Sequence, residues 1–234
     1  MNLLISSIFV GVLLIVMIIG FERAKPRPRD LMPVVVLAAL AVLGRVITMP
    51  IPNFQPATAL IVLAGLFFGK HAGLLCGMLV ALVSNMFMGQ GPWTLWQMMA
   101  WGLVGYGSGL LGQQISASFA NSSSDTGLDP LTSDKSMNSL TSTAPIAQRS
   151  LAFQIIVIVY GAVASLLFGA FQDLQFFIAF TAEAGWPGLI ATLSMGLPLN
   201  LIHAASTLIF LLLVLIPWGK KLHRLRIKYG IRSI

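Results

Sequence analysis

The chain has 234 residues, of which 57% are hydrophobic and 9% are charged, whereas roughly a quarter of the residues in a soluble domain are charged. These proportions exclude a water-soluble globular domain. The formal net charge of +7 comes from 14 Lys and Arg against 7 Asp and Glu, charges too few and too segregated to coat a nucleic-acid-binding surface. The single cysteine, Cys76, excludes a disulfide framework or a cysteine-based metal site within the chain.

Seven apolar segments are candidates for membrane-spanning helices, because a bilayer core about 30 Å thick needs roughly 20 apolar residues in a helix. In chain order they cover residues 2–20, 31–49, 56–68, 72–88, 93–112, 151–171 and 187–217. The third is short, and Gly69-Lys70-His71-Ala72-Gly73 joins it to the fourth, which predicts a tight helical hairpin. Pro198 predicts a tilt or kink in the last. The sequence therefore predicts an all-α integral membrane protein.

The positive charges orient these spans, because cytoplasmic loops carry an excess of Lys and Arg. Segments 21–30, 69–71, 113–150 and 218–234 alternate with the other loops and together hold 13 of the 14 Lys and Arg. The remaining loops hold none, and only Arg45 lies within a span. We therefore expect the N-terminus outside, the C-terminus in the cytoplasm and a multi-pass location in the plasma membrane. The basic cluster follows segment 2–20, the opposite order to a signal peptide.

Two of the predicted cytoplasmic segments differ from the spans in composition. Segment 113–150 is rich in Ser, Thr, Asn and Asp, and its lack of an apolar period predicts a flexible linker. The basic segment 218–234 is compatible with a stop-transfer anchor or with an interfacial helix at the anionic inner leaflet. The predicted organisation is thus an N-terminal transmembrane helix (1–20), a basic segment (21–30), a helical membrane domain (31–217) and a basic tail (218–234).

Small residues recur every four positions, as expected where helix backbones approach closely in lipid. The pattern favours packing within the chain over a subunit interface, and part of the first series serves the predicted hairpin. The three series are Gly65, Gly69, Gly73 and Gly77; Gly105 and Gly109; and Gly161, Ser165 and Gly169.

Polar side chains beside apolar spans are costly in a membrane, so each is a candidate functional residue. Arg45 could meet a ligand anion, latch a loop through Asp173 or Glu183, or extend to the outer headgroups. His203 is expected to be a packing histidine rather than a metal ligand.

Two predicted outside loops combine amides with aromatic residues. Residues 49–56 hold three prolines with Asn53 and Gln55, and residues 85–97 hold amides and tryptophans. This combination is suited to a large, partly apolar ligand rich in amides or ring nitrogens. For the tryptophans, an interfacial aromatic belt is the alternative. The candidate ligand-binding residues are Arg45, Asn53, Gln55, Asn85, Gln90, Trp93, Trp96 and Gln97, with Asn200 in the last span.

Several catalytic and energising motifs are absent from the sequence. It contains no phosphate-binding loop of the Gly-x-x-x-x-Gly-Lys-Ser/Thr type, no carboxylate pair within the spans for proton coupling, and no hydrolase motif. We therefore expect no catalytic residues, no bound metal or cofactor, and a partner that supplies the energy for any transport.

The sequence resembles the substrate-binding S components of energy-coupling factor vitamin transporters, and it looks closest to the cobalamin branch. The resemblance covers roughly residues 31–217 and is densest over 44–112. Its motifs are Gly44-Arg45, Pro52-Asn53-Phe54-Gln55-Pro56-Ala57-Thr58-Ala59, Phe68-Gly69-Lys70-His71-Ala72-Gly73, Ser84-Asn85 and Gly89-Gln90-Gly91-Pro92-Trp93-Thr94-Leu95-Trp96-Gln97.

This resemblance implies a six-helix bundle with an outward-opening vitamin site, to which the helix at 1–20 is an addition. It also implies docking on a transmembrane coupling protein carried by two cytoplasmic ATPases. The usual Ala-x-x-x-Ala docking motif is absent from the first family helix, where Ala38 and Ala41 are the best candidates. Cobalamin or a related corrinoid is the expected ligand. The alternatives are another vitamin or precursor (riboflavin, thiamine, folate or a queuosine precursor), a self-sufficient secondary transporter, and a structural or assembly factor.

Overall fold

The computed structural model describes residues 2–23, 25–124, 151–231 and 233–234, and every regular element within them is helical. This agrees with the predicted all-α class. The elements are α1 (Asn2–Arg23), α2 (Pro28–Ile47), α3 (Ala57–Phe68), α4 (Lys70–Met88), α5 (Trp93–Ser124), α7 (Leu151–Phe176), η3 (Phe177–Thr181), η4 (Ala182–Ala184) and α8 (Gly185–Lys228).

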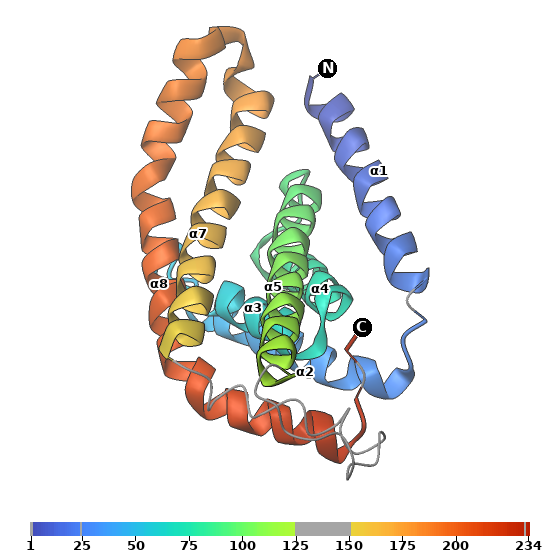
Figure 1. Cartoon of the computed structure of the whole chain (residues 1–234). Coiled ribbons are helices and arrows are strands. Elements are labelled where there is room, and N and C mark those ends of the chain that lie inside the picture. The colour runs from blue at the N-terminus through green and yellow to red at the C-terminus, as the bar shows by residue number, and fades with distance from the viewer. Residues whose placement is uncertain (1, 24, 125–150, 232) are drawn as a thin grey trace.

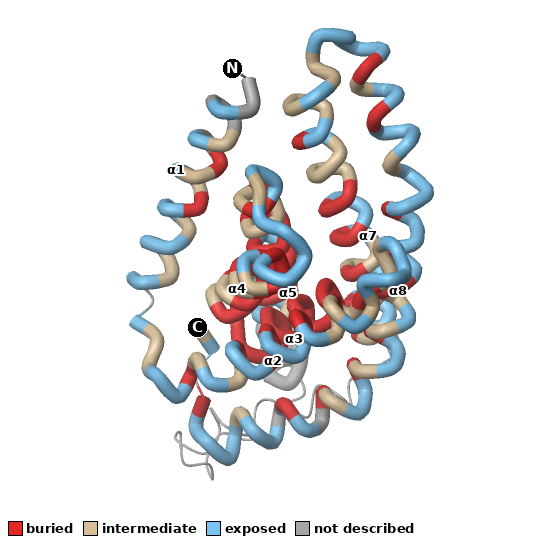
Figure 2. Tube along the Cα trace, turned by 180° about the vertical axis from the view of Figure 1, so that it is seen from behind, coloured by how far each residue is buried: buried red, intermediate tan, exposed pale blue. Residues whose placement is uncertain are grey.

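The helices α2 to α5 form the centre of the molecule, with α1 on one side of α5 and the α7–α8 pair on the other (Figures 1 and 2). The most extensive contacts join α4 to α5 and α7 to α8. One end of the bundle carries residues 48–56 and 89–92, which one hydrogen-bond network joins through Gln55 and Gln90. The η3–η4 turn lies farther out, at the tip of the α7–α8 pair (Figure 1). The charge distribution predicts that this end faces outside, and we call it the predicted outer end.

The short helix α3 is the centre of the core. All 12 of its residues are buried, which Figure 2 shows as a continuous buried stretch. A helix of 12 residues is about 18 Å long, too short to cross a bilayer core of about 30 Å in an extended lipid-facing position. Its neighbours α2, α4, α5 and α8 enclose it instead.

Glycines let α3, α4 and α5 approach until their backbones touch. A Cβ atom on Gly105 would lie 2.0 Å from the backbone oxygen of Gly73, and one on Gly77 would lie 2.2 Å from the backbone oxygen of Trp101. The hairpin between α3 and α4 turns at Gly69, whose φ of 103° favours glycine. The prediction that the small-residue series serve packing within the chain is confirmed at these positions.

The additional helix α1 packs against α4 and α5. Val10 and Leu14 are buried in a cluster with Met78, Trp96 and Met99. This apolar contact explains why residues 2–23 lie beside the bundle even though the resemblance begins only at about residue 31.

Exposed apolar side chains cover the outer faces of the bundle, as expected for a protein in lipid. Long stretches of α1, α7 and α8 expose Ile, Leu and Val side chains. Figure 2 accordingly colours much of these three helices as exposed. By length and mean hydropathy, three stretches of the described chain are long and apolar enough to cross a membrane: Pro28–Ile47, Lys70–Met88 and Leu151–Lys228, the last of which includes α7 and α8.

The helices extend beyond three of the predicted boundaries. α5 continues to Ser124, so the first part of the predicted linker 113–150 is helical, because no Gly or Pro interrupts the chain between Gly112 and Ser124. The rest of that linker, residues 125–150, lies outside the described residues. α8 continues through Pro217 to Lys228. The predicted loop 172–186 is helical throughout, formed by the end of α7, by η3 and η4, and by the start of α8.

The predicted basic tail packs against the chain at the end opposite the predicted outer end. The Ile234 amide donates to the carbonyl of Phe68 at 2.9 Å, and the Ile234 carbonyl accepts from the His71 amide at 3.0 Å. Arg226 Nη1 donates to the carbonyl of Phe67 at 3.3 Å. These bonds satisfy backbone groups that the end of α3 and the start of α4 leave unpaired.

The two alanines expected to dock a partner are inside the bundle. Ala38 is 5% exposed and Ala41 is fully buried, both within the main core. They face inward because the exposed side of α2 is occupied by larger residues, among them Val36, Leu40 and Leu43. In this structure a partner that approaches α2 from the lipid meets that aliphatic face.

Candidate functional site

Arg45 is the centre of a buried polar network at the predicted outer end. It lies in the last turn of α2 and is only 8% exposed. Its Nε donates to Gln55 Oε1 at 3.0 Å, and its Nη1 donates to Asn85 Oδ1 at 3.1 Å and to Ser84 Oγ. The guanidinium also lies 4.7 Å above the ring of Trp101. These contacts hold Arg45 inside the bundle, so it does not extend to the headgroups.

Asn85 connects the arginine to the start of α5. Its Nδ2 donates to Gln97 Oε1 at 2.7 Å and to Thr94 Oγ1 at 3.0 Å. Thr94 in turn donates to Gln90 Oε1 at 2.8 Å. The sharp turn between α4 and α5 passes through Gly89, with a φ of 107°, and brings these residues together. Sequence positions 45, 55, 85, 90 and 97 are therefore joined in one hydrogen-bond network.

A second set of buried contacts lies beneath the arginine. The indole N–H of Trp101 donates to Thr58 Oγ1 at 3.0 Å, and this hydroxyl lies 2.8 Å from His203 Nε2. Phe168 stacks on Trp101 with ring centroids 4.6 Å apart and meets His203 edge-on. His203 is thus held by packing and by one hydroxyl, as expected from the sequence, and it also borders the cavity described next.

The network opens into a polar cavity of about 170 Å³ between α2, α5, α7 and α8. The residues 48–56 enter its wall through Asn53, whose φ of 57° is in the left-handed region that asparagine tolerates. Ser206 of α8 holds this loop, because its Oγ lies 3.3 Å from both the amide and the carbonyl of Gln55. The lining residues are Arg45, Asn53, Gln55, Gln97, Phe168, Gly169, Gln172, Asp173, Gly196, Leu199, Asn200 and His203.

The α7–α8 side of this cavity is built from an amide, a carboxylate and two glycines. Asn200 Nδ2 donates to Asp173 Oδ2 at 2.7 Å. A Cβ atom on Gly169 would lie 2.1 Å from Asn200 Oδ1, and one on Gly196 would lie 2.3 Å from Asp173 Oδ2. Each polar side chain therefore rests on a glycine of the opposite helix, which fixes its position.

The structure brings five of the nine predicted ligand-binding residues to the cavity wall: Arg45, Asn53, Gln55, Gln97 and Asn200. Asn85 stands behind Arg45 and Gln97 and orients both. Gln90 is exposed and reaches the network only through Thr94, while its Nε2 donates to the carbonyl of Leu82.

The predicted tryptophans lie elsewhere. Trp96 is 5% exposed and packs against Phe171 and the α1 residues, away from the polar cavity. Trp93 is 41% exposed at the start of α5. Helical spacing puts Trp93, Trp96 and Gln97 on one face of α5, but α1 packs against Trp96, so only Gln97 of these three borders the cavity. The aromatic residue at the cavity wall is Phe168, which lies in an apolar run without a distinguishing sequence signal.

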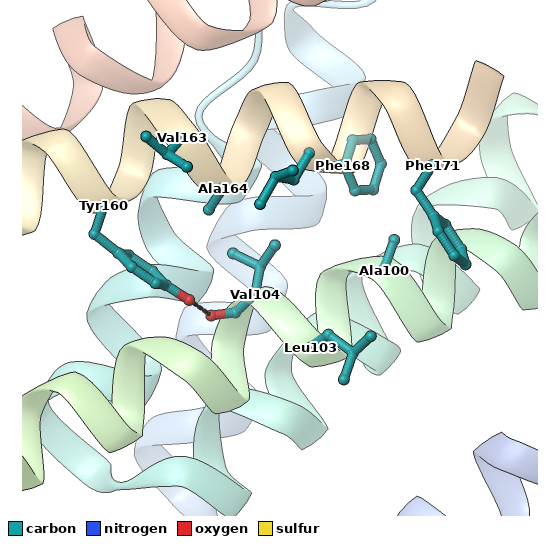
Figure 3. Close-up of a pocket in the computed structure, with 9 residues that line it drawn as sticks. Ala100, Leu103, Val104, Tyr160, Val163, Ala164, Phe168 and Phe171 are labelled. Atoms are coloured by element: carbon teal, nitrogen blue, oxygen red, sulfur yellow. Dashed lines mark hydrogen bonds between the residues drawn. The ribbon is translucent and has the colours of Figure 1, made fainter. Parts of the chain in front are cut away.

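A second, apolar cavity of about 350 Å³ lies between α5 and α7 and shares Phe168 with the polar one (Figure 3). Ala100, Val104 and Ala164 leave the space between the helices, and Tyr160 closes one end by donating its hydroxyl proton to the carbonyl of Val104 at 2.6 Å. Phe171 lies at the other end in the same view. Phe168 therefore separates a polar from an apolar space.

The site has the features of a binding site for a neutral or mixed polar and apolar molecule, built on rigid helices. Within the described part of the chain, no group of three or more His, Cys, Asp or Glu side chains is placed to hold a metal ion. The chemistry that the geometry offers is hydrogen bonding by amides and an arginine beside aromatic rings.

Comparison with known proteins agrees with this description. Residues 29–126 match a family model described as ECF-type riboflavin transporter, S component. The matched stretch holds α2 to α5 and so most of the polar network. No curated protein and no solved structure matches the chain. The match does not confirm the cobalamin branch expected from the sequence. The match covers residues 29–126, less than half of the chain, and it shows that this part is similar to S components of the energy-coupling factor type.

Proposed function

We propose that this chain captures cobalamin or a related corrinoid on the outer side of a bacterial plasma membrane and delivers it for ATP-driven uptake by partner subunits. The observation that carries the proposal is the polar cavity, whose wall holds five amides together with Arg45 inside an otherwise apolar bundle. Corrinoids carry several carboxamide side chains around a large ring, so amides and an arginine are suitable partners for their polar edge.

The residues we expect to contact the vitamin are those of the cavity wall. Arg45, Gln55 and Gln97 would bond the polar edge of the ligand, while Phe168 would pack on its ring system. The partners in this proposal are a transmembrane coupling protein and two cytoplasmic ATPases, in keeping with the absence of a phosphate-binding loop from the sequence.

Riboflavin is the second candidate, and two observations favour it. The matching family model is described by that vitamin. The polar cavity of about 170 Å³ is also below the range of roughly 300–1,000 Å³ that is usual for drug-sized ligands. A flavin ring needs much less room than a corrinoid, for which the α7–α8 pair would have to move away from the cavity.

Equilibrium titration of the purified, detergent-solubilised chain separates these candidates. Cyanocobalamin, riboflavin, thiamine, folate and a queuosine precursor are each titrated directly, and the others then compete against whichever binds. Binding of cyanocobalamin below about 1 μM supports the proposal. If riboflavin alone binds, the corrinoid assignment is wrong, and the second candidate replaces it. If none of the five binds, the chain is not a receptor for these vitamins.

Energy coupling needs its own measurement. Cells that express the chain with the coupling protein and both ATPases should take up the vitamin, and uptake should disappear when the catalytic residues of the ATPases are replaced. A self-sufficient secondary transporter would instead support uptake in liposomes that contain this chain alone and an ion gradient. That result would overturn the energy-coupling assignment for this chain.

A further inference from the structure

The arginine at the cavity determines which way the neighbouring amides point. A guanidinium group can only donate hydrogen bonds, so the atom of Asn85 that faces Arg45 must be the oxygen. The Nδ2 of Asn85 is then the atom that donates to Gln97 Oε1 at 2.7 Å. This leaves Nε2 of Gln97, a donor, without a bond in the network. The orientation of both amides therefore follows from chemistry rather than from the shape of the side chains.

Arg45 orients the amide of Gln55 in the same way. Gln55 Oε1 accepts from Arg45 Nε at 3.0 Å, and Nε2 of Gln55 is a donor with no hydrogen-bond partner among the described residues. Arg45 Nη2 has no hydrogen-bond partner among the residues that the structure describes. Arg45, Gln55 and Gln97 all line the cavity, so this wall offers N–H donors. We call these three residues the donor wall.

The side of the cavity formed by α7 offers acceptors. Gln172 Oε1 is buried without a partner in the described part of the chain. Asp173 uses Oδ2 to accept from Asn200, which leaves Oδ1 able to accept a second bond. No ion pair joins Asp173 to Arg45, and the single ion pair found in the described residues is between Arg27 and Asp30. We call Gln172 and Asp173 the acceptor wall.

We propose that this cavity recognises the edge of a carboxamide or imide, with the ligand's carbonyl oxygens against the donor wall and its N–H against the acceptor wall. A free carboxylate satisfies the donor wall but is repelled by Asp173, and a cation is repelled by Arg45. A neutral group that carries an acceptor and a donor side by side satisfies both. The cavity volume of about 170 Å³ is about five or six times the share of one water molecule in the liquid, enough for such an edge but not for a whole vitamin.

This inference rests on the proposed function and adds the chemical group of the vitamin that the cavity recognises, a carboxamide or an imide. Both candidate vitamins carry it, because the pyrimidine ring of riboflavin is an imide and the periphery of a corrinoid is rich in primary carboxamides. Thiamine carries a fixed positive charge, so it is predicted not to compete. The specificity of the site then comes from unpaired donors and acceptors, which are costly when the ligand lacks the matching group.

The test pairs a change in the ligand with a change in the protein. If riboflavin is the ligand, the probe is riboflavin methylated on the imide nitrogen, and if a corrinoid is the ligand, the probes are the monocarboxylic acids of cyanocobalamin. The protein variant is Asp173→Asn. Its side-chain oxygen can still accept from Asn200, while the NH2 group replaces the second carboxylate oxygen, so an acceptor becomes a donor at that position. Glu183→Gln is the matched control, because Glu183 lies in η4 and is not part of the cavity wall.

We expect wild-type protein to bind the altered ligand about 10 to 100 times more weakly than the parent vitamin. Asp173→Asn should weaken binding of the parent vitamin and reduce the difference in affinity between the parent and the altered ligand. If a corrinoid is the ligand, the variant should also bind one of the monocarboxylic acids more strongly than wild type does. Equal discrimination by wild type and Asp173→Asn, with the parent vitamin still bound, overturns the inference and leaves the proposed function standing. If wild type binds neither vitamin, the proposed function fails, and the inference fails with it.

Discussion

Replacement of Asn85 by alanine tests whether the polar network holds the predicted outer end together. Asn85 is 2% exposed and makes three hydrogen bonds to side chains, to Arg45 at 3.1 Å, Thr94 at 3.0 Å and Gln97 at 2.7 Å. Asn85→Ala removes all three at once and leaves buried donors and acceptors on the three neighbours. The change should therefore lower the free energy of unfolding.

The size of the effect follows from the bonds that are lost. In soluble proteins a neutral hydrogen bond contributes about 1 kcal/mol and one to a charged group about 2 kcal/mol, whereas side-chain bonds in a membrane protein average about 0.6 kcal/mol. Two neutral bonds and one charged bond thus give a loss of about 2 to 4 kcal/mol. For a chain of this size, that corresponds to a decrease in melting temperature of about 4 to 16 °C.

The chain carries its own reporter for this measurement. Cys76 is the single cysteine in the sequence and is fully buried in α4, so a thiol-reactive fluorophore reacts with it only when the helices separate. Thermal unfolding in detergent can be followed by that reaction for the wild type and Asn85→Ala without an engineered label.

Gln90→Ala is the matched control, because Gln90 is an amide of the same predicted loop but is exposed to solvent. Its replacement should cost less than about 1 kcal/mol. If Asn85→Ala melts within about 2 °C of wild type, the three hydrogen bonds do not support the bundle and the reasoning is refuted. If Asn85→Ala and Gln90→Ala lower the melting temperature equally, the burial of Asn85 does not explain its loss of stability.

Three further predictions use the same melting assay or the vitamin titration. Gly105→Ala should destabilise the chain by about 1–3 kcal/mol, because the new Cβ would lie 2.0 Å from the backbone oxygen of Gly73 and force α4 and α5 apart. Thr58→Val should cost about 1–3 kcal/mol, because it leaves the buried indole N–H of Trp101 without its acceptor. Trp96→Phe should leave vitamin affinity within about twofold of wild type, because Trp96 packs against α1 and does not line the polar cavity.

Each of these has a control and a contradicting result. Gly11→Ala adds a Cβ where no atom lies within 4 Å, so its stability should match wild type, and equal losses at positions 11 and 105 would contradict the close helix contact. Thr58→Ser keeps the hydroxyl and should retain most of the stability. Gln97→Ala should weaken vitamin binding, and a stronger effect from Trp96→Phe would place the ligand on the α1 side of α5.

Composition and local pattern are enough to predict the class of protein, the approximate position of the helices and the pattern of close packing. Few charges and long apolar runs require a membrane environment, because each helix must satisfy its backbone hydrogen bonds internally. The spacing of small residues identified the contacts at Gly73 and Gly105, because close approach of two backbones tolerates only small side chains. Polar residues in apolar surroundings marked the network from Arg45 to Gln97, because such residues are costly unless they are bonded.

The tertiary structure decided which of these polar and aromatic residues meet, and which way each one points. Helical spacing placed Trp96 and Gln97 side by side, yet only the position of α1 decides that Trp96 packs in the core while Gln97 faces the cavity. Asp173 and Phe168 reach the cavity from α7, more than 100 residues along the chain from Arg45. No local sequence pattern predicts that these residues meet Arg45 in space. Local periodicity fixes the faces of a helix, whereas the packing of all helices together fixes which face borders the cavity, and that packing is what gives the site its donor wall and its acceptor wall.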